Sequence, residues 1–445
     1  MIPTTWRRYH LSQLVNKALG LEKAIPFDFL VRGEILRTTL AEWCAERGVG
    51  EEETLEIEYI ESVLPPQKIS EFPHESWVSS VSCKLSSHFL TAAYDGHFRA
   101  FDLSRNTVLD APLHNAPITS FTLLPSSSPS TDDTYTVLTA SQDLTAQISQ
   151  ITLPGINNTP SSSKALATLH LHTSPVSSIA ADSKGKQVLT SSWDGLIGLW
   201  DTSIPASDEV PEPEATSTST DRKKRRKIQK DELETKPKRK APLNVLKSHV
   251  GRVSKVVWTS DQAALSCGFD STVRTWDVEN GVCTQTITAS EKPFLDITPT
   301  SNGQSALAVS TDRTMTMYDL RIQNLSAATA SFLHPATPSC VAVHSSTSAS
   351  TSASPSPTSA NQVVTGAYDG VVRVWDVRST KEAVALFKAF NNNDASGNAG
   401  VKKILSVDWY RDVVLVGGEG GLDVWKVQGG GDSASGQEQQ VKRSS

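Results

Sequence analysis

The chain has 445 residues, of which 38% are hydrophobic and 20% are charged, and its formal net charge is −6. This composition is typical of a folded protein, and the length predicts two or three separately folded units rather than one core. No run of about 18 apolar residues occurs, and residues 1–14 contain no hydrophobic leader, so we expect neither a membrane span nor a secretory signal.

Residues 1–65 are predicted to form a small α+β domain. Five apolar side chains share one face of a first helix: Leu11, Leu14, Val15, Ala18 and Leu19. Residues 27–36 then predict a strand pair with a turn centred on Arg32 and Gly33. A second helix and a last strand follow, and this order of elements corresponds to an incomplete β-grasp.

The second helix carries its own start and stop signals. Thr39 and Glu42 have the spacing of a capping box, and Gly48 supplies the residue that ends the helix. Residues 55–60 alternate as a strand. In these two elements we expect the following side chains to point inward: Leu40, Trp43, Cys44, Leu55, Ile57 and Tyr59.

From residue 66 to residue 428 one pattern recurs seven times. Each copy runs through two apolar strands to a turn acid, and then through an alternating strand that closes in Trp-Asp or its remnant. Such a copy predicts a four-stranded antiparallel blade, and blades that cannot bury both faces alone stack into a closed ring. The turn acids are Asp95, Asp143, Asp194, Asp270, Asp312, Asp369 and, in the degenerate seventh copy, Glu419. We therefore predict an all-β, seven-bladed WD-repeat propeller behind the N-terminal domain.

Two spacings between turn acids are too long for one blade, 76 residues before Asp270 and 57 residues before Asp369. Residues 203–242 are rich first in Glu, Pro and Thr and then in Lys and Arg, and residues 345–361 are almost entirely Ser, Thr, Ala and Pro. Neither segment can bury enough apolar surface to offset the entropy lost on ordering. We expect both to be disordered loops, and the tail at residues 429–445 likewise.

Polar residues that could form a catalytic site recur in several copies rather than once. His172, Ser192 and Asp194 would suit a nucleophilic triad, but the set returns with a terminal Trp, which favours a buried structural brace. The glycine-rich residues 417–421 lack the Lys-Ser/Thr of a phosphate loop and predict a turn. The five scattered cysteines favour a reducing compartment over a disulfide or zinc site. We predict no enzyme activity, no cofactor and no metal held by this chain alone.

A basic segment interrupts an otherwise acidic chain. Residues 222–240 contain eleven basic and three acidic side chains and carry a net charge of +8. Because the whole chain carries −6, the rest of the chain carries about −14. The basic residues form two clusters: Lys223, Lys224, Arg225, Arg226 and Lys227, then Lys236, Lys238, Arg239 and Lys240. This spacing predicts a bipartite nuclear import signal and an importin as partner, with a solvated charge run or local contact with RNA as alternatives.

The string PFDFLVRGEILRTTLAEW, then LEIEY and LPP, and the segment EFPHESWVSSV before the first blade carry a specific resemblance. Over essentially residues 2–427 the chain resembles the WD-repeat subunit of the PeBoW ribosome-assembly complex, which couples a ubiquitin-like, Notchless-type domain to a seven-bladed propeller. The resemblance implies a scaffold for pre-rRNA processing and large-subunit maturation in the nucleus, nucleolus and nucleoplasm. It implies a pescadillo-like protein, a block-of-proliferation-like WD-repeat protein, the AAA ATPase midasin and pre-60S particles as partners, and no membrane.

In this family the N-terminal domain begins with a β-hairpin that the present chain lacks. The helix face of Leu14 and Leu19 would then be without its sheet. Either the true start lies upstream of Met1 or the domain is compromised, and we expect a truncated gene model.

The resemblance also implies a contact with a metal-ion-dependent adhesion site in midasin. Such a site leaves one octahedral position of its Mg²⁺ open for a carboxylate of the partner. In this family the carboxylate is a Glu in the loop after the second helix, and the register from Gly48 and LEIEY puts it at Glu52, with Glu51 and Glu53 as alternatives. Midasin would then use ATP to strip the complex from the pre-ribosome.

A function of a different class is suggested by YDLR at residues 318–321 and WDVR at residues 375–378. These resemble the paired WDxR boxes by which a substrate receptor docks onto a cullin-RING ubiquitin ligase. A generic propeller hub is a third interpretation. The proteins that copurify with the chain would discriminate among the three.

Overall fold

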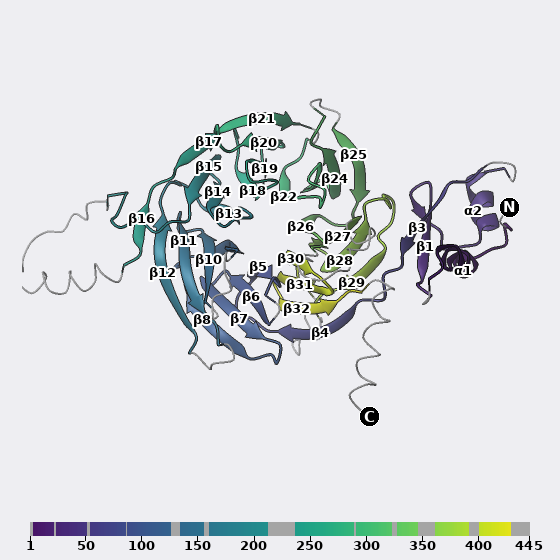
Figure 1. The fold of residues 1–445 in the computed structure, drawn as a ribbon, viewed down its shortest axis with the longest axis horizontal. Helices are drawn as coiled ribbons and strands as arrows, with labels where there is room; N and C mark the ends of the chain where they lie inside the picture. Colours follow the sequence, from purple (N-terminus) through teal and green to yellow (C-terminus); the bar gives the residue numbers. More distant parts are fainter. Residues whose placement is uncertain are drawn as a thin grey trace, which may run out of the picture.

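The computed structural model describes residues 3–21, 24–50, 54–85, 87–125, 134–154, 160–211, 236–288, 291–322, 327–345, 361–390 and 400–428. In these residues seven sheets form a closed ring, and a small domain with two helices stands beside it (Figure 1). The predicted fold class, a seven-bladed propeller behind a small α+β domain, is confirmed. No helix within these ranges is long and apolar enough to cross a membrane.

The N-terminal domain packs two helices on one face of a three-stranded antiparallel sheet. Its elements are α1 (Arg8–Leu19), β1 (Phe27–Val31), β2 (Glu34–Ile35), α2 (Leu40–Arg47) and β3 (Ile57–Glu61), and its strand order is β2-β1-β3. The predicted turn at Arg32 and Gly33 joins β1 to β2, with both residues at positive φ. The predicted capping box is present, since the Glu42 amide donates to the Thr39 hydroxyl, and Gly48 ends α2 in the left-handed conformation.

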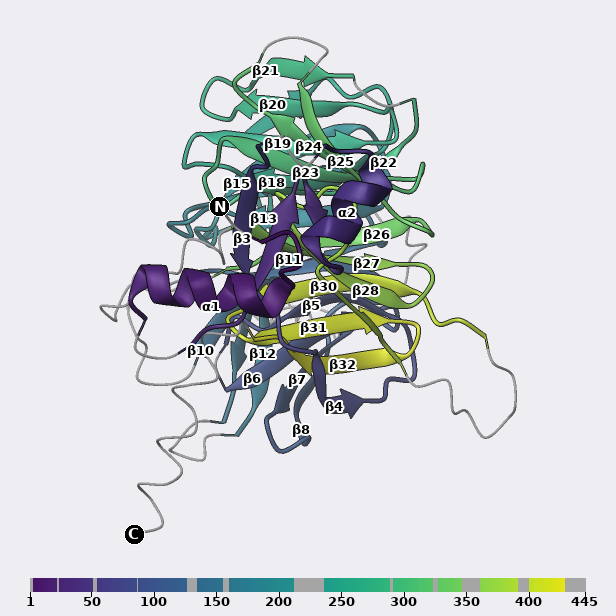
Figure 2. The same ribbon diagram turned by 90° about the vertical axis from the view of Figure 1, so that its right-hand side faces the viewer.

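Burial in this domain differs from the prediction at Tyr59. This residue was expected inward but is 44% exposed, although its ring packs edge-on against Phe27. Its neighbour Ile60 is only 1% exposed, and Leu30, on the same face of the sheet as Ile60, is 2% exposed. The alternation misled in two ways, because Tyr59 lies on the edge strand β3, where the helices leave it exposed, and because the face that carries Ile60 is not open to solvent. The helices cover one face, and the other face is turned towards the ring (Figures 1 and 2).

The face predicted for the first helix is only partly buried. Leu11 packs into the domain core with Phe27, Phe29 and Trp43. Leu14 and Leu19 are 42% and 49% exposed, respectively. In the part of the chain that the structure describes, no sheet lies against these two leucines.

Each blade is built on four antiparallel strands, to which blade 2 adds a fifth strand that is described below. Blade 1 contains β5 (Val78–Ser82), β6 (His88–Ala93), β7 (His97–Asp102) and β8 (Thr107–Pro112); blade 2 contains β9 (Ile118–Leu123), β10 (Thr134–Ser141), β11 (Ala146–Thr152) and β12 (Ser162–Leu169). Blade 3 contains β13 (Val176–Ala181), β14 (Gln187–Ser192), β15 (Leu196–Asp201) and β17 (Asn244–Lys247); blade 4 contains β18 (Val253–Trp258), β19 (Ala263–Gly268), β20 (Val273–Asp277) and β21 (Val282–Ile287).

Blades 5 to 7 complete the ring. Blade 5 contains β22 (Phe294–Pro299), β23 (Ser305–Ser310), β24 (Thr314–Asp319) and β25 (Ala328–Leu333); blade 6 contains β26 (Pro338–Val343), β27 (Gln362–Ala367), β28 (Val371–Asp376) and β29 (Ala385–Lys388). Blade 7 combines β30 (Ile404–Tyr410), β31 (Val413–Gly418) and β32 (Gly421–Lys426) with β4 (Gln67–Phe72), which comes from the other end of the propeller sequence. The apolar core lies between neighbouring blades, as where Cys267 of blade 4 packs in one cluster with Phe294 and Tyr318 of blade 5.

Hydrogen bonds tie the innermost strand of each blade to the next blade. In five blades a hydroxyl at the same position donates to a carbonyl of the following blade, at 2.6–2.7 Å: Ser79 to Ile118, Thr119 to Val176, Ser177 to Val253, Ser254 to Phe294, and Ser339 to Ile404. In the other two blades a carboxylate takes over. Asp296 accepts from the Val341 amide (3.0 Å), and Asp408 accepts from the Cys83 amide (2.9 Å). Every seam of the ring is therefore bridged.

The insertion between blades 3 and 4 is ordered at its base, so the prediction of disorder over residues 203–242 is wrong at both ends. β16 (Lys238–Lys240) pairs in parallel with β12 as a fifth strand of blade 2. The Glu209 amide donates to the Arg239 carbonyl (2.8 Å), and the Arg239 amide donates to Asp208 (2.9 Å). Backbone pairing with an edge strand requires no apolar side chain, so composition did not reveal it. Residues 212–235, 346–360 and 429–445 lie outside the described residues.

Candidate functional site

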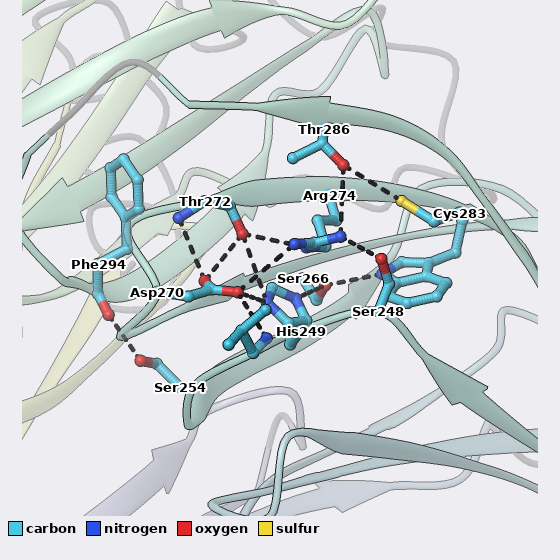
Figure 3. A network of polar contacts seen from close by, with 12 residues as sticks. Ser248, His249, Ser254, Ser266, Asp270, Thr272, Arg274, Cys283, Thr286 and Phe294 are labelled. Carbon is cyan, nitrogen blue, oxygen red and sulfur yellow. Dashed lines mark hydrogen bonds and ion pairs between the residues drawn. The ribbon is translucent and has the colours of Figure 1, made fainter.

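The recurrent polar set of the repeats forms a buried network, and blade 4 holds a complete copy (Figure 3). The His249 ring lies between the Asp270 carboxylate (2.8 Å from Nδ1) and the Ser266 hydroxyl (2.6 Å from Nε2). Trp276 Nε1 donates to the same hydroxyl at 2.7 Å, and the Thr272 hydroxyl donates to Asp270 at 2.8 Å. The network thus connects the segment before β18 with β19, the turn after β19, and β20.

Blades 2 and 3 repeat the His–Asp contact of blade 4. His114 contacts Asp143 (2.7 Å), and His172 contacts Asp194 (3.1 Å). In blade 3 the hydroxyl beside His172 belongs to Thr190, at 2.9 Å, rather than to the predicted Ser192. The Ser192 hydroxyl donates to the Ser174 carbonyl instead (2.9 Å). The structure therefore does not bring His172, Ser192 and Asp194 together as a triad.

Blades 1 and 6 use a different contact for the turn acid. Asp95 pairs with Arg99 (2.7 Å), and Asp369 pairs with Arg373 (2.6 Å). In blade 6 the His334 ring then lies between the Phe332 carbonyl and the Thr365 hydroxyl. Asp312 of blade 5 accepts hydrogen bonds from the amide and hydroxyl of Thr314 within its own turn.

Burial and partners together set the charge states in these networks. Burial alone would raise the pKa of Asp270, but the hydrogen bond and charge of His249, with bonds from Thr272 and the Val250 amide, hold it well below its usual range. The pKa values of Asp143 and Asp194 are lowered in the same way. Burial lowers the pKa of His334 to about 4. The turn acids are therefore anions that fasten a turn, and His334 is a neutral ring.

These networks are braces rather than reaction centres. The His249 and His172 side chains are 0% and 2% exposed, and Ser266 is fully buried. A nucleophile needs an accessible position next to its base and room for a substrate. The networks instead hold each turn to its blade.

A second candidate surface lies at the centre of one face of the ring. In six blades the residue before the turn acid donates its amide to the residue before the innermost strand, as Trp193 does to Pro175 (3.1 Å) and Phe269 to Arg252 (2.7 Å). In blade 7 Glu419 itself makes this bond, to Lys403 (3.0 Å), so Glu419 occupies the position before the turn and not the predicted position of the turn acid. Because the bond recurs in all seven blades, these positions share one face of the ring. Four of the seven residues that donate this bond are aromatic: Tyr94, Trp193, Phe269 and Tyr368.

The side chains of this aromatic face reach solvent and are joined by cations. Trp193 and Tyr368 are each 38% exposed, and the Arg252 guanidinium lies 4.5 Å from the Trp193 ring centre. On the other side the Lys403 ammonium lies 5.7 Å from the Tyr368 ring centre. Trp77, which is 47% exposed, packs beside Tyr94 at a ring distance of 5.9 Å. Tryptophan, tyrosine and arginine are the residues that most often anchor protein interfaces.

A signal for this face is present in the sequence, although it is not part of the repeat pattern itself. The signal is the residue immediately before each turn acid, which is visible once the seven copies are aligned on Asp95 and its equivalents. An aromatic residue there has no role in the brace. Its recurrence in four copies therefore predicts a surface rather than a core.

Only some of the predicted partner-binding residues lie in the part of the chain that the structure describes. The acidic candidates and the first basic cluster, Glu51, Glu52, Glu53, Lys223, Lys224, Arg225, Arg226 and Lys227, lie outside the described residues. The second basic cluster, which includes Lys236, leads into β16, where Lys238 and Arg239 are partly exposed. Lys240 is only 2% exposed, and its ammonium contacts Asp201 and the Ser203 carbonyl. Burial lowers the pKa of Lys240, so this cluster does not offer all four predicted cations to a receptor.

The two arginines of the ligase-type boxes close their own turns. Arg321 forms a two-pronged pair with Asp319 (3.0 and 2.7 Å), and Arg378 does so with Asp376 (2.9 and 2.8 Å). The charge of Glu58 in the N-terminal domain also helps to raise the pKa of Arg378. This geometry supplies a packing role for both boxes.

Comparison with known proteins gives a consistent picture. The NLE (NUC135) domain model matches residues 1–44, and the model of the WD domain, G-beta repeat, matches residues 163–201, 240–277 and 338–376. The chain is 66% identical to "Ribosome biogenesis protein YTM1" of Coprinopsis cinerea, over 96% of this chain and 91% of that protein. It is 59% identical to the protein of that name from Laccaria bicolor (96% and 90%) and 31% identical to that from Saccharomyces cerevisiae (93% and 89%).

Proposed function

The chain belongs to the family of the ribosome biogenesis protein YTM1, the Notchless-type WD-repeat subunit of the PeBoW complex, and we propose that it acts there as a non-enzymatic scaffold. A role in ribosome biogenesis follows from the family. The finer proposal is large-subunit assembly in the nucleolus and nucleoplasm, with pre-60S particles as the site of action. The single observation that carries it is the exposed aromatic face, on a ring whose polar networks are internal braces.

We propose that the aromatic face holds the block-of-proliferation-like propeller protein, which in turn joins the chain to the pescadillo-like protein. The test is the triple variant Trp193→Ala/Phe269→Ala/Tyr368→Ala. Interface aromatics of this kind contribute on the order of 2 kcal/mol each, which is about thirtyfold in affinity. Because such contributions are not additive, we expect the affinity of the triple variant for the recombinant partner to fall by at least the roughly thirtyfold of a single residue.

The matched control removes apolar side chains that are still more exposed, from outer strands, as Val282→Ala/Leu333→Ala/Leu386→Ala. Calorimetric titration should give wild-type affinity for this control. Equal affinity of the triple variant and wild type would contradict the assignment of the face.

We also propose that the N-terminal domain supplies a carboxylate ligand to the adhesion-site Mg²⁺ of midasin, with Glu52 as the ligand. A carboxylate fits because Mg²⁺ prefers oxygen donors in octahedral geometry. Glu52→Ala should abolish binding to the recombinant adhesion domain in Mg²⁺, whereas Glu51→Ala and Glu53→Ala should bind as wild type does. Chelation by EDTA should remove binding by all. Wild-type binding by Glu52→Ala in Mg²⁺ would refute the assignment.

Nuclear import by an importin is proposed to rest on the basic segment. The fold dictates which variant tests it, because removing Lys240 would also disturb β16. Replacing Lys223, Lys224, Arg225, Arg226 and Lys227 by alanine leaves β16 intact and should shift a fluorescently tagged chain to the cytoplasm. Fusion of a foreign import signal to the same variant should restore nuclear fluorescence. A variant that stays nuclear without that fusion would overturn the proposal.

A further inference from the structure

The N-terminal domain is joined to the ring through the strand that closes it. β3 ends at Glu61 and β4 begins at Gln67, so five residues separate the domain from blade 7. β4 is an edge strand, and β32 is its single neighbour in the sheet. Tension between the domain and the ring therefore reaches β4 before it reaches any other strand of the propeller.

β4 is held unevenly along its length. At its far end Phe72 is 3% exposed and packs into the cluster between blades 7 and 1. At the end near the domain Gln67 is exposed, and Ile69 is 48% exposed. The ladder with β32 is also irregular there, because Ile69 is an extra residue between the paired Lys68 and Ser70. Such a bulge interrupts the ladder and weakens the strand pairing locally, and the Ile69 carbonyl instead accepts a hydrogen bond from Arg105 of blade 1 (3.1 Å).

A few contacts hold the near end of β4 and the residues that precede it. The Leu64 amide donates to the Gln428 carbonyl (2.9 Å), and Val63 packs against the cluster shared by blades 6 and 7. Lys68 pairs with the buried carboxylate of Asp423 at 3.2 Å. The near half of β4 is thus held to the ring by a small number of bonds. A force on the N-terminal domain would break these bonds one after another.

The domain itself rests on blade 6 through exposed ion pairs. Glu34 of β2 pairs with Lys381 (2.6 Å), and Arg37 pairs with Glu382 (3.0 Å). Lys381, Arg37 and Glu382 have side chains that are 56%, 64% and 56% exposed, whereas the Glu34 side chain is 12% exposed. Exposed ion pairs contribute little and are weakened by salt. The domain is therefore docked by these ion pairs and by the sheet face of Leu30 and Ile60, which is turned towards the ring, and it is tethered by β4.

From these contacts we infer that β4 is a tension-sensitive closing strand. A pull on the N-terminal domain, directed away from the ring, first separates the domain from blade 6 and then peels β4 from β32, beginning at Gln67 and ending at the Phe72 anchor. Blade 7 is left with β30, β31 and β32, and Leu422 and Val424, both fully buried in the closed ring, lose their cover. The inference rests on the proposed function only for its use, since midasin would pull on this domain.

The experiment is single-molecule force spectroscopy on the full chain. Azide-bearing residues that replace Tyr9 of α1 and Val282 of β21, which are 67% and 51% exposed, attach the two handles. We expect the first extension after undocking to be the release of residues 62–72, which span roughly 35 Å when extended. A first extension as long as a whole blade or the whole N-terminal domain would overturn the inference.

A disulfide across the strand pair gives the decisive comparison. Gln67 and Lys426 are partners in the β4–β32 register, and neither is buried, so Gln67→Cys/Lys426→Cys can form a disulfide. The disulfide transmits the force from Gln67 directly to β32, so β4 cannot peel away from β32. The short extension should vanish in the oxidised protein and return with reductant. Thr316→Cys/Ser331→Cys, a surface pair of β24 and β25, should keep it. An unchanged extension in the oxidised β4 variant would overturn the inference.

The measurement is independent of midasin, so the two proposals fail separately. A chain that shows the short extension but does not bind the adhesion domain supports the closing strand and refutes its proposed use. A chain that binds the adhesion domain but opens elsewhere refutes the closing strand and leaves the proposed function intact.

Discussion

At the scale of single residues, Ser266 carries two hydrogen bonds that have no replacement. Trp276 Nε1 donates to its hydroxyl, and His249 Nε2 lies 2.6 Å away, while Ser266 and Trp276 are 0% and 1% exposed. Water cannot take over either bond at this depth. The brace is thus a closed set in which each polar group depends on the others.

Ser266→Ala should therefore destabilise the propeller strongly. It leaves the Trp276 N–H and His249 Nε2 without partners, and each buried unsatisfied group costs about 1–3 kcal/mol. We expect the free energy of unfolding in urea to fall by about 2–4 kcal/mol. Asp312→Asn is the matched control, because Asp312 is exposed and serves only its own turn; it should cost less than about 1 kcal/mol. A Ser266→Ala variant as stable as that control would contradict the brace.

His334 makes stability depend on pH. Burial lowers the pKa of His334 from 6.5 to about 4. Between these two pH values the imidazole is protonated in the unfolded chain but stays neutral in the folded chain. Its contribution is fully present above pH 6.5 and is lost as the pH falls towards 4, by up to about 3 kcal/mol. His334→Gln removes this term. Urea denaturation at several pH values should show wild type losing about that much more stability than the variant between pH 7 and pH 4, and parallel curves would refute the assignment.

A helix or strand can be predicted from the sequence when its own side chains carry a recognisable pattern. The capping box of Thr39 and Glu42 and the recurring strand and turn pattern did so, and α2 and the seven blades were predicted from them, although Glu419 lies one position before the turn. β16 and β4 did not, because each joins a sheet by backbone bonds to a strand far away in the sequence. The exposure of Tyr59 and the burial of Ile60 were missed for a related reason, since the parts of a sheet that are covered depend on elements that local alternation cannot reveal.

β16 should depend on Lys240 alone among its basic residues. Lys240→Met keeps the aliphatic stem but removes the ammonium that contacts Asp201 and the Ser203 carbonyl. We expect faster hydrogen exchange of the Arg239 and Lys240 amides and of Glu209, with unchanged exchange in the seven blades. Lys238→Met, on the same strand but only partly buried, should leave exchange as in wild type. Equal protection in both variants would show that the backbone bonds suffice.

At the scale of the whole molecule, the ring is a rigid frame that presents one surface and carries one attachment. Its seams are bridged blade by blade, its polar networks are internal, and its exposed aromatic side chains are gathered on one face. The number of blades followed from counting repeats. The position of the N-terminal domain beside blade 6 could not be predicted, because it depends on surface ion pairs such as Glu34 with Lys381, which have no sequence signature.

A scaffold of large-subunit assembly should carry its partners through affinity purification of the tagged chain from a nuclear extract, and mass spectrometry would identify them. We expect recovery of the pescadillo-like and block-of-proliferation-like proteins with large-subunit precursors. We also expect these proteins to be lost in Trp193→Ala/Phe269→Ala/Tyr368→Ala and retained in Val282→Ala/Leu333→Ala/Leu386→Ala. Recovery of a cullin adaptor in place of these proteins would contradict the scaffold function, although it would not affect the description of the fold.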